Sequence, residues 1–272
     1  MFRSIIVAIK SMLAKSQAFT RFAVFVRNQA NTIVRLRLTD SPWVRESGET
    51  WLIEDVGSQC RTFVDVGGNR GTWTELMLAQ GGEEKRGLVF EPSTSALRML
   101  NDKFGARPEV TIIPAAVSDQ LGETQFFEEN EAGGTSSCVP GYSKPDAVRR
   151  VVKTTTVDSS LAEHGMSDVD FMKIDIEGFD LYALRGARKL IDERRVGIIQ
   201  FEYNESWLGS GSTIHGAVDL LKSGGMDVFL LNRDGLFTPN LALYGEYFGL
   251  SNYVALSPAW RQKLSSRIRG AL

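Results

Sequence analysis

The sequence predicts a doubly wound α/β fold, with a mostly parallel sheet of seven strands over residues 56–272 and a helical extension over residues 1–55. Short apolar runs alternate with helical stretches from residue 61 onward, and no internal repeat is present. Several of the apolar runs end in glycine or in an acidic residue. Repeated strand–helix units favour a parallel sheet that is covered by helices on both faces.

The first half of this region predicts three strands and two helices. Residues 61–67, 86–92 and 109–117 are short apolar runs typical of buried strands. We expect helices at residues 72–80, ended by glycines, and at 95–104, with Ser93 as the N-cap. Residues 122–129 and 149–158 then predict two strands without a helix between them, joined by a long loop.

The second half resumes the alternation. Strands are expected at residues 169–178, 196–203, 226–232 and 252–257, with helices after the first of them through Leu190 and at residues 213–225. This order is Rossmann-like. In such sheets ligands bind outside the carboxyl ends of the strands, so the residues that end strands are the candidates for a site.

Residues 1–39 have an unusual charge pattern, because they contain seven basic residues and no acidic residue. Apolar residues recur there at helical spacing, but basic residues keep every apolar run far below the roughly 20 residues of a membrane span. Two hypotheses stay open. The helices pack on the main domain or on a second subunit of a homo-oligomer, or residues 1–38 attach peripherally to an anionic membrane face.

Composition excludes several classes of protein. Cys60 and Cys138 form no Cys-x-x-Cys motif, so we expect neither a disulfide scaffold nor a zinc ribbon, and a reducing, cytoplasmic location. With only His164 and His215, a polyhistidine metal site is excluded. The net charge of −2, with the acidic residues in the body, argues against a nucleic-acid partner.

The first two predicted strands end in residues that suit a nucleoside-containing cofactor. Asp65 stands two residues before Gly67, where glycines let the backbone approach a ligand at a helix N-terminus. A carboxylate at this position suits a cationic ligand with an ammonium and a sulfonium group. Glu91 ends the second strand and can accept both hydroxyls of a ribose. The plain alternative is a tight strand-to-helix turn without a ligand.

Four motifs together resemble those of the FkbM family of S-adenosylmethionine-dependent methyltransferases. They cover the chain in order from about residue 61 to about residue 257. The motifs are Asp65-Val66-Gly67-Gly68-Asn69-Arg70-Gly71, Val89-Phe90-Glu91-Pro92, Ala115-Ala116-Val117-Ser118-Asp119 with Gly122, and Lys173-Ile174-Asp175-Ile176-Glu177-Gly178. Gly68 stands where the family commonly has alanine. The resemblance implies a class I methyltransferase fold and S-adenosylmethionine as the cofactor.

The resemblance also implies roles for individual residues. Asp65, Gly67, Asn69 and Gly71 would line the methionine and ribose part of the cofactor, and Glu91, with Ser93 beyond it, would hold the ribose hydroxyls. Ala116 and Val117 would flank the adenine; plain core packing is the alternative for these two.

Three carboxylates are the candidates for the chemistry. Asp175 and Glu177 end the fourth core strand with the same parity, and Glu202 ends the fifth, so all three are expected at one rim. A protonated hydroxyl is a poor nucleophile, so a base or a metal is expected. We predict Asp175 as the floor beside the methyl group and Glu177 or Glu202 as general base. One rival has the three holding Mg²⁺; the other has them capping helices or pairing with Lys173.

We therefore expect an O-methyltransferase that acts on a hydroxyl of a sugar, glycolipid, polysaccharide or other natural product. An N-methyltransferase, an NAD(P)-dependent oxidoreductase and a non-catalytic binding protein on the same fold are the alternatives. Residues 133–137 form a candidate flap or a plain connector, and Tyr203, Asn204 and Trp207 are candidates either for stacking on the acceptor or for packing.

Overall fold

The computed structural model describes residues 2–38, 48–82, 84–129 and 134–272, and it divides into two compact units, Met1–Thr39 and Asp40–Leu272. The first unit consists of α1 (Phe2–Ala14) and α2 (Gln17–Leu38). None of the described helices combines the length and the apolar character needed to cross a bilayer. The division lies before the predicted boundary at residue 55, because Glu49–Val56 forms α3, whose apolar side chains belong to the core of the second unit.

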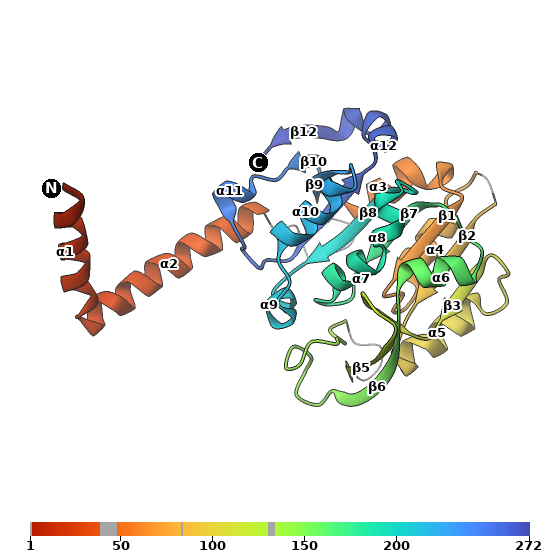
Figure 1. The fold of residues 1–272 in the computed structure, drawn as a ribbon, viewed down its shortest axis with the longest axis horizontal. Helices are drawn as coiled ribbons and strands as arrows, with labels where there is room; N and C mark the ends of the chain where they lie inside the picture. Colours follow the sequence, from red (N-terminus) through yellow and green to blue (C-terminus); the bar gives the residue numbers. More distant parts are fainter. Residues whose placement is uncertain (1, 39–47, 83, 130–133) are drawn as a thin grey trace. The chain divides into compact units, whose positions relative to one another are not determined.

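The described part of the second unit is built on a nine-stranded sheet in the order β12-β10-β9-β11-β8-β7-β1-β2-β3 (Figure 1). Seven of these strands are the predicted ones: β1 (Thr62–Val66), β2 (Arg86–Phe90), β3 (Val110–Ile113), β7 (Val169–Ile174), β8 (Val196–Tyr203), β9 (Asp227–Asn232) and β11 (Ser251–Leu256). The first five run parallel, and β11 lies antiparallel between β8 and β9. This arrangement confirms the predicted fold class.

The strand order reverses at β1. From β1 the chain moves outward to β2 and β3, and then returns to β7 on the other side of β1. The carboxyl ends of β1 and β7 therefore flank the point at which ligands bind in sheets of this type.

Two features of the sheets differ from the prediction. The short strands β10 (Gly235–Thr238) and β12 (Ile268–Ala271) extend the edge beyond β9, which makes nine strands rather than seven in the described chain. The predicted strand at 109–117 is also divided at Pro114. Proline lacks the amide hydrogen of a ladder bond, so the chain leaves the main sheet there.

The residues after Pro114 belong to a second sheet. β4 (Ala116–Val117) pairs with β6 (Val148–Thr155), which also pairs with β5 (Gly122–Glu128). Figure 1 shows β5 and β6 apart from the main sheet. The two strands that were predicted without a helix between them are this β5–β6 pair.

The helices bury their apolar sides on the main sheet. α3, α4 (Thr72–Ala79), α5 (Thr94–Phe104) and α12 (Pro258–Lys263) share one core with Phe63, Phe171 and Val254 of the strands. Trp73 of α4 packs edge-on against Phe171, with ring centroids 5.1 Å apart. The other helices are α6 (Val157–Glu163), α7 (Asp180–Gly186), α8 (Arg188–Asp192), α9 (Ser206–Ser210), α10 (Ile214–Ser223) and α11 (Leu241–Tyr244), with short 3₁₀ turns at Gly57–Gln59 and Ser265–Arg267.

Candidate functional site

A cavity of about 320 Å³ opens at the carboxyl ends of β1, β2, β7 and β8, within the range of about 300–1,000 Å³ that is typical of small-molecule sites. Its lining includes most of the residues that the sequence singled out: Gly67, Asn69, Glu91, Ser93, Ala116, Val117, Asp175, Glu177 and Glu202. Asp65 and Gly71 are not among the lining residues. Residues from strands far apart in the sequence thus converge where the sheet topology places a ligand.

The turn after β1 fits tightly between its neighbours. Gly67 has φ 91°, and a Cβ at this position would lie 2.1 Å from the carbonyl oxygen of Asp175, so the close approach of β7 requires glycine. The amides of Gly67 and Gly68 both donate to the carbonyl of Phe90, each at 3.0 Å. Gly71, with φ 77°, begins α4 and packs against Phe104. A glycine at position 71 is therefore needed both for the turn and for the close packing against Phe104.

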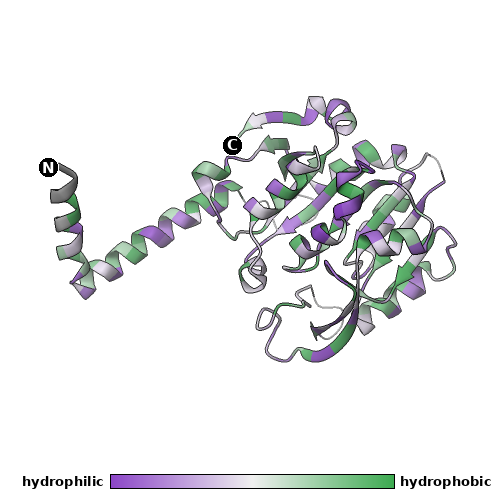
Figure 2. Cartoon of the chain, viewed as in Figure 1, coloured by the Kyte–Doolittle hydropathy of each residue, from purple (hydrophilic) through white to green (hydrophobic). Residues whose placement is uncertain are grey.

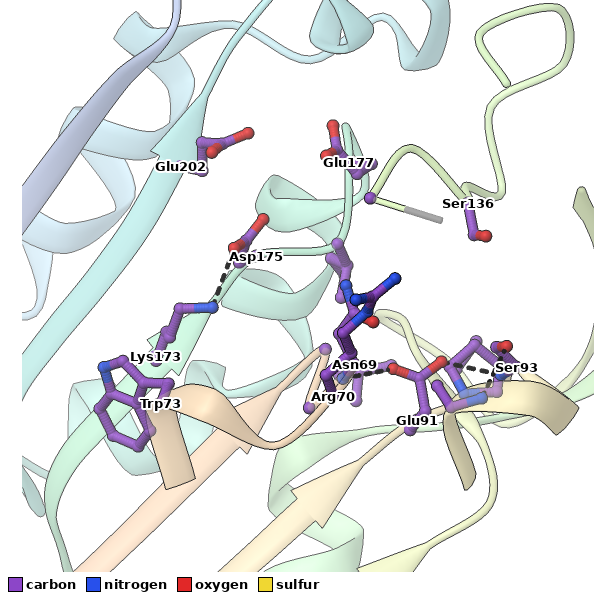
Figure 3. A pocket seen from close by; sticks show the side chains of 18 of the residues that line it. Asn69, Arg70, Trp73, Glu91, Ser93, Ser136, Lys173, Asp175, Glu177 and Glu202 are labelled. Atoms are coloured by element: carbon purple, nitrogen blue, oxygen red, sulfur yellow. Dashed lines mark hydrogen bonds and ion pairs between the residues drawn. The ribbon is translucent and has the colours of Figure 1, made fainter. Parts of the chain in front are cut away.

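The Glu91 carboxylate is held in place by two backbone amides. The amide of Asn69 donates to Oε2 and that of Ser93 to Oε1, each at 2.8 Å (Figure 3). Glu91 is nevertheless buried, and desolvation raises its pKa to about 7. A carboxylate accepts more than two hydrogen bonds, so Glu91 keeps acceptor capacity toward the cavity.

Asn69 contributes an unsatisfied polar atom. Its φ of 43° is a left-handed conformation, and its side-chain Oδ1 is buried with no hydrogen-bond partner in the described chain. Buried polar atoms without a partner are rare in native proteins, so a donor from a ligand is the expected partner.

Beneath the cavity, Lys173 lies among three carboxylates. Its Nζ is 2.9 Å from Oδ2 of Asp175, and Asp65 and Glu49 also interact with it electrostatically. Burial alone would lower the pKa of Lys173, but these carboxylates outweigh burial and raise it. Lys173 is therefore a charged ion-pair partner of Asp175.

Asp65 lies below the lining residues with none of its surface exposed. Its Oδ2 accepts a hydrogen bond of 2.6 Å from Thr74 Oγ1, and Oδ1 has no partner in the described chain. Desolvation raises the pKa of Asp65 to about 6. Asp65 thus contributes negative potential from beneath the cavity.

Glu49 is a lining residue that the sequence did not reveal. It lies on α3, ahead of the first strand, and accepts a hydrogen bond from the side-chain amide of Gln200 on β8. Desolvation raises the pKa of its carboxyl group. No motif marks this position, because only the packing of α3 beside the sheet brings Glu49 to the cavity.

Asp175, Glu177 and Glu202 form a carboxylate cluster at the rim, with one oxygen of each within 4.8 Å of the others. Figure 3 shows Glu177 and Glu202 on the same side of the cavity as Asp175. Nδ2 of Asn204 donates to Glu177 at 2.9 Å and to Glu202 at 2.6 Å. Oδ1 of Asn204 accepts from the amide of Ser206, which fixes the direction of the side-chain amide.

The protonation of this cluster is strongly perturbed. Desolvation, followed by the charge of Asp175, raises the pKa of Glu177 to about 8. Desolvation and the charges of Asp175 and Glu177 raise the pKa of Glu202 well above its ordinary value. Near neutral pH, Glu177 and Glu202 therefore retain protons that exposed carboxyl groups would have lost.

The loop between β5 and β6 reaches the same rim. Gly134 and Ser136 line the cavity, and Ser137 Oγ donates to the backbone carbonyl of Glu177 at 2.6 Å. The hydroxyl of Tyr142 hydrogen-bonds to the Glu177 side chain, and burial, with the nearby charge of Glu177, raises the pKa of Tyr142. The described part of the candidate flap, residues 134–137, is thus in contact with the site; Gly133 lies outside the described residues.

Other candidates from the sequence lie away from the cavity lining. Tyr203 and Trp207 are completely buried and pack edge-on against each other, which matches the packing interpretation. His215 pairs with Glu246 at 2.7 Å and is not a lining residue. Asn204 is the residue of this group that contacts the carboxylate cluster.

Comparisons with known proteins agree with the family resemblance. A model of the methyltransferase FkbM domain matches residues 65–228. A search of the curated proteins found no match.

Three solved structures that this chain resembles share little sequence with it. A methyltransferase FkbM from Methylobacillus flagellatus is 15% identical, with a TM-score of 0.45; the match covers 71% of this chain and 43% of that one, so this chain spans less than half the length of that protein. An O-methyltransferase from Bacillus cereus in complex with SAH is 11% identical, with a TM-score of 0.40 and coverage of 84% and 88%. A putative O-methyltransferase from Klebsiella pneumoniae is 13% identical, with a TM-score of 0.40 and coverage of 77% and 79%.

We predict that Lys173→Met destabilises the fold by about 3–5 kcal/mol, because breaking a buried ion pair leaves uncompensated carboxylates. Lys103→Met is the matched control, since Lys103 and Glu75 form a 2.6 Å pair that is largely exposed; its loss is expected to change stability by no more than about 1 kcal/mol. Urea denaturation of both variants measures the difference. Equal stabilities would show that Lys173 does not compensate the carboxylates.

Proposed function

Because this chain belongs to the FkbM methyltransferase family, we propose that it is an S-adenosylmethionine-dependent methyltransferase, that the cavity binds S-adenosylmethionine and that the rim carboxylates serve methyl transfer to a hydroxyl. The observation that carries the proposal is Glu91, a carboxylate held by two backbone amides at the end of β2, beside the unsatisfied Oδ1 of Asn69.

The residues at the end of β2 fit the nucleoside half of this cofactor. Glu91 would accept the two ribose hydroxyls, and Asn69 Oδ1 offers a further acceptor beside it. Ala116 and Val117, both buried and both lining the cavity, provide apolar contact for an adenine. Ser93 fixes Glu91 through its amide and caps α5 through its hydroxyl.

The residues below the cavity fit the amino acid half. Asp65, Glu49 and Asp175 surround the single ammonium group of Lys173, so negative charge exceeds positive charge when all four groups are ionised. A cationic ligand suits this environment, because it would stabilise carboxylates whose desolvation is otherwise unfavourable. We assign Glu49 to the ammonium group of the methionine part.

When bound, S-adenosylmethionine supplies a methyl group on a positively charged sulfur, which is reactive toward an aligned nucleophile. The chain must orient the acceptor hydroxyl and accept its proton. Glu202 or Glu177 is suited to this role, because a general base works best with a pKa near the operating pH. Asn204 holds both carboxyl groups in place, and Asp175 forms the floor beside the methyl group.

The raised pKa values of Glu177 and Glu202 favour a hydroxyl over an amine as the methyl acceptor. A neutral amine has a free electron pair and needs no base. A site for N-methylation therefore gains nothing from buried carboxyl groups whose pKa values are raised. Sugars, glycolipids, polysaccharides and other hydroxylated natural products are the acceptor classes that we propose. The small loop residues Gly134 and Ser136 leave room for such a molecule beside the rim.

The same carboxylate cluster could hold Mg²⁺, but its existing partners favour the base role. Asp175 is already paired with Lys173, and the Asn204 amide donates to both Glu177 and Glu202. A metal ion would have to compete with an ammonium group and with an amide donor directed at the same carboxyl groups.

We expect Glu91→Gln to weaken the binding of S-adenosylhomocysteine by roughly 10- to 150-fold, because a hydrogen bond to a charged group contributes about 1.5–3 kcal/mol. Binding to the wild-type protein should tighten as the pH rises through about 7, where Glu91 ionises and becomes the better acceptor. The Glu91→Gln variant should lose this pH dependence of binding. Isothermal titration calorimetry between pH 6 and 8 measures both effects, with the exposed Glu75→Gln as control; an unchanged affinity in Glu91→Gln would contradict the ribose assignment.

We expect Glu49→Gln to weaken S-adenosylhomocysteine binding by about tenfold, in line with the loss of one charge-assisted hydrogen bond. 5′-Methylthioadenosine, which lacks the amino acid part, should bind the variant and the wild type equally. Glutamine can still accept the hydrogen bond from Gln200, so the comparison isolates the charge. If both ligands weaken together, Glu49 supports the pocket without contacting the ammonium group.

We expect Glu202→Gln to lower turnover by at least about 100-fold, the usual contribution of a general base. In Glu177→Gln the pH at which the rate rises should shift downward, because removing the charge of Glu177 lowers the pKa of Glu202 and the ionised base appears at lower pH. The measurement is transfer of a tritiated methyl group to a panel of saccharide and phenolic acceptors from pH 6 to 9.

Two outcomes would redirect this assignment. Turnover that EDTA abolishes and Mg²⁺ restores would replace the general base with a metal site. Turnover of an amine acceptor that survives Glu202→Gln would replace O-methylation with N-methylation. Full activity in EDTA, together with the loss in Glu202→Gln, is the expected result.

A further inference from the structure

α1 and α2 combine apolar and cationic side chains in a way that nothing in the methyl-transfer site requires. Their exposed large apolar residues are Ile6, Val7, Ile9, Met12, Phe19, Phe22, Val24, Phe25, Val26, Ile33 and Leu36. Figure 2 shows hydrophobic and hydrophilic segments alternating along α2. Residues 1–39 also contain seven basic residues and no acidic one.

The spacing places several of the apolar side chains along one side of each helix. Ile6, Ile9 and Met12 recur every three residues along α1. In α2, Phe19, Phe22, Val26 and Ile33 follow the three- and four-residue steps of one helical face. Arg21 and Arg35 fall on the opposite side of α2. The first unit is thus a pair of helices with an apolar stripe, and all of its charged side chains are cationic.

Described residues 48–272 offer little apolar surface for these helices to cover. The exposed large apolar residues of the described part of that unit are only Leu121, Val148, Val151, Leu208 and Leu243; Val148 and Val151 share β6, and the other three lie elsewhere in the sequence. A second copy of the helices would bring like charges together, because residues 1–39 of each copy contain seven basic residues and no acidic one. Neither the second unit nor a second copy of the helices matches both the apolar and the cationic character of α1 and α2.

We propose that α1 and α2 bind the surface of an anionic phospholipid bilayer. The apolar side chains enter the boundary between headgroups and acyl chains, and the lysines and arginines contact the lipid phosphates. Neither helix crosses the bilayer, in agreement with their composition. This inference uses no residue of the cavity and is independent of the proposed acceptor.

The test is co-sedimentation of the full chain with vesicles. We expect at least about tenfold stronger binding to phosphatidylcholine vesicles with 30% phosphatidylglycerol than to pure phosphatidylcholine, and weaker binding at high salt, because the charges are screened. Phe22→Asp with Phe25→Asp should abolish binding to both vesicles. Arg21→Glu with Arg27→Glu should remove the preference for anionic vesicles.

Matched controls separate the proposal from general effects of charge and folding. Leu208→Asp places the same change on an exposed apolar residue of the other unit, and Lys189→Glu with Lys222→Glu reverses two exposed charges there; both should bind as the wild type does. Wild-type protein that binds neither vesicle, or both equally, overturns the proposal. Light scattering that shows a dimer lost in the Phe22/Phe25 variant, without vesicle binding, would assign the helices to a second copy instead.

Discussion

The cavity depends on one buried cation. Lys173 projects from β7 among Asp65, Asp175 and Glu49, and without it these three carboxylates would stand close together in a poorly hydrated environment. A buried ion pair contributes little net stability compared with apolar packing, so its presence here is better explained by what it permits. It lets a folded protein keep several carboxylates beneath the cavity in which we propose that a cationic ligand binds.

The sequence predicted the parts of the fold that local pattern controls. The seven core strands, the strand-ending residues Glu91, Asp175 and Glu202 and the Ser93 cap all follow from short apolar runs and from the chemistry of the residues that end them. The family match over residues 65–228 covers the same region. These features could be predicted because each depends on neighbours close in the chain.

The features that the sequence missed depend on contacts between distant residues. Glu49 reaches the cavity through the packing of α3, and Asn204 acquires its role only because β8 lies beside β7. Pro114 was visible in the sequence, yet the partner of the strand after it, β6, follows more than 30 residues later. β10 and β12 have four residues each, and their pattern is too weak to separate them from loops.

The close fit of Gly67 against the Asp175 carbonyl determines which parts of the cavity wall can accept substitutions. At Gly67 the backbone contacts the backbone of Asp175 directly, so this position tolerates no larger residue. The segment between β5 and β6 also reaches the cavity, because Gly134, Ser136 and Cys138 line it and Ser137 and Tyr142 contact Glu177. Substitutions in that segment can therefore reshape the rim without disturbing the backbone contact at Gly67.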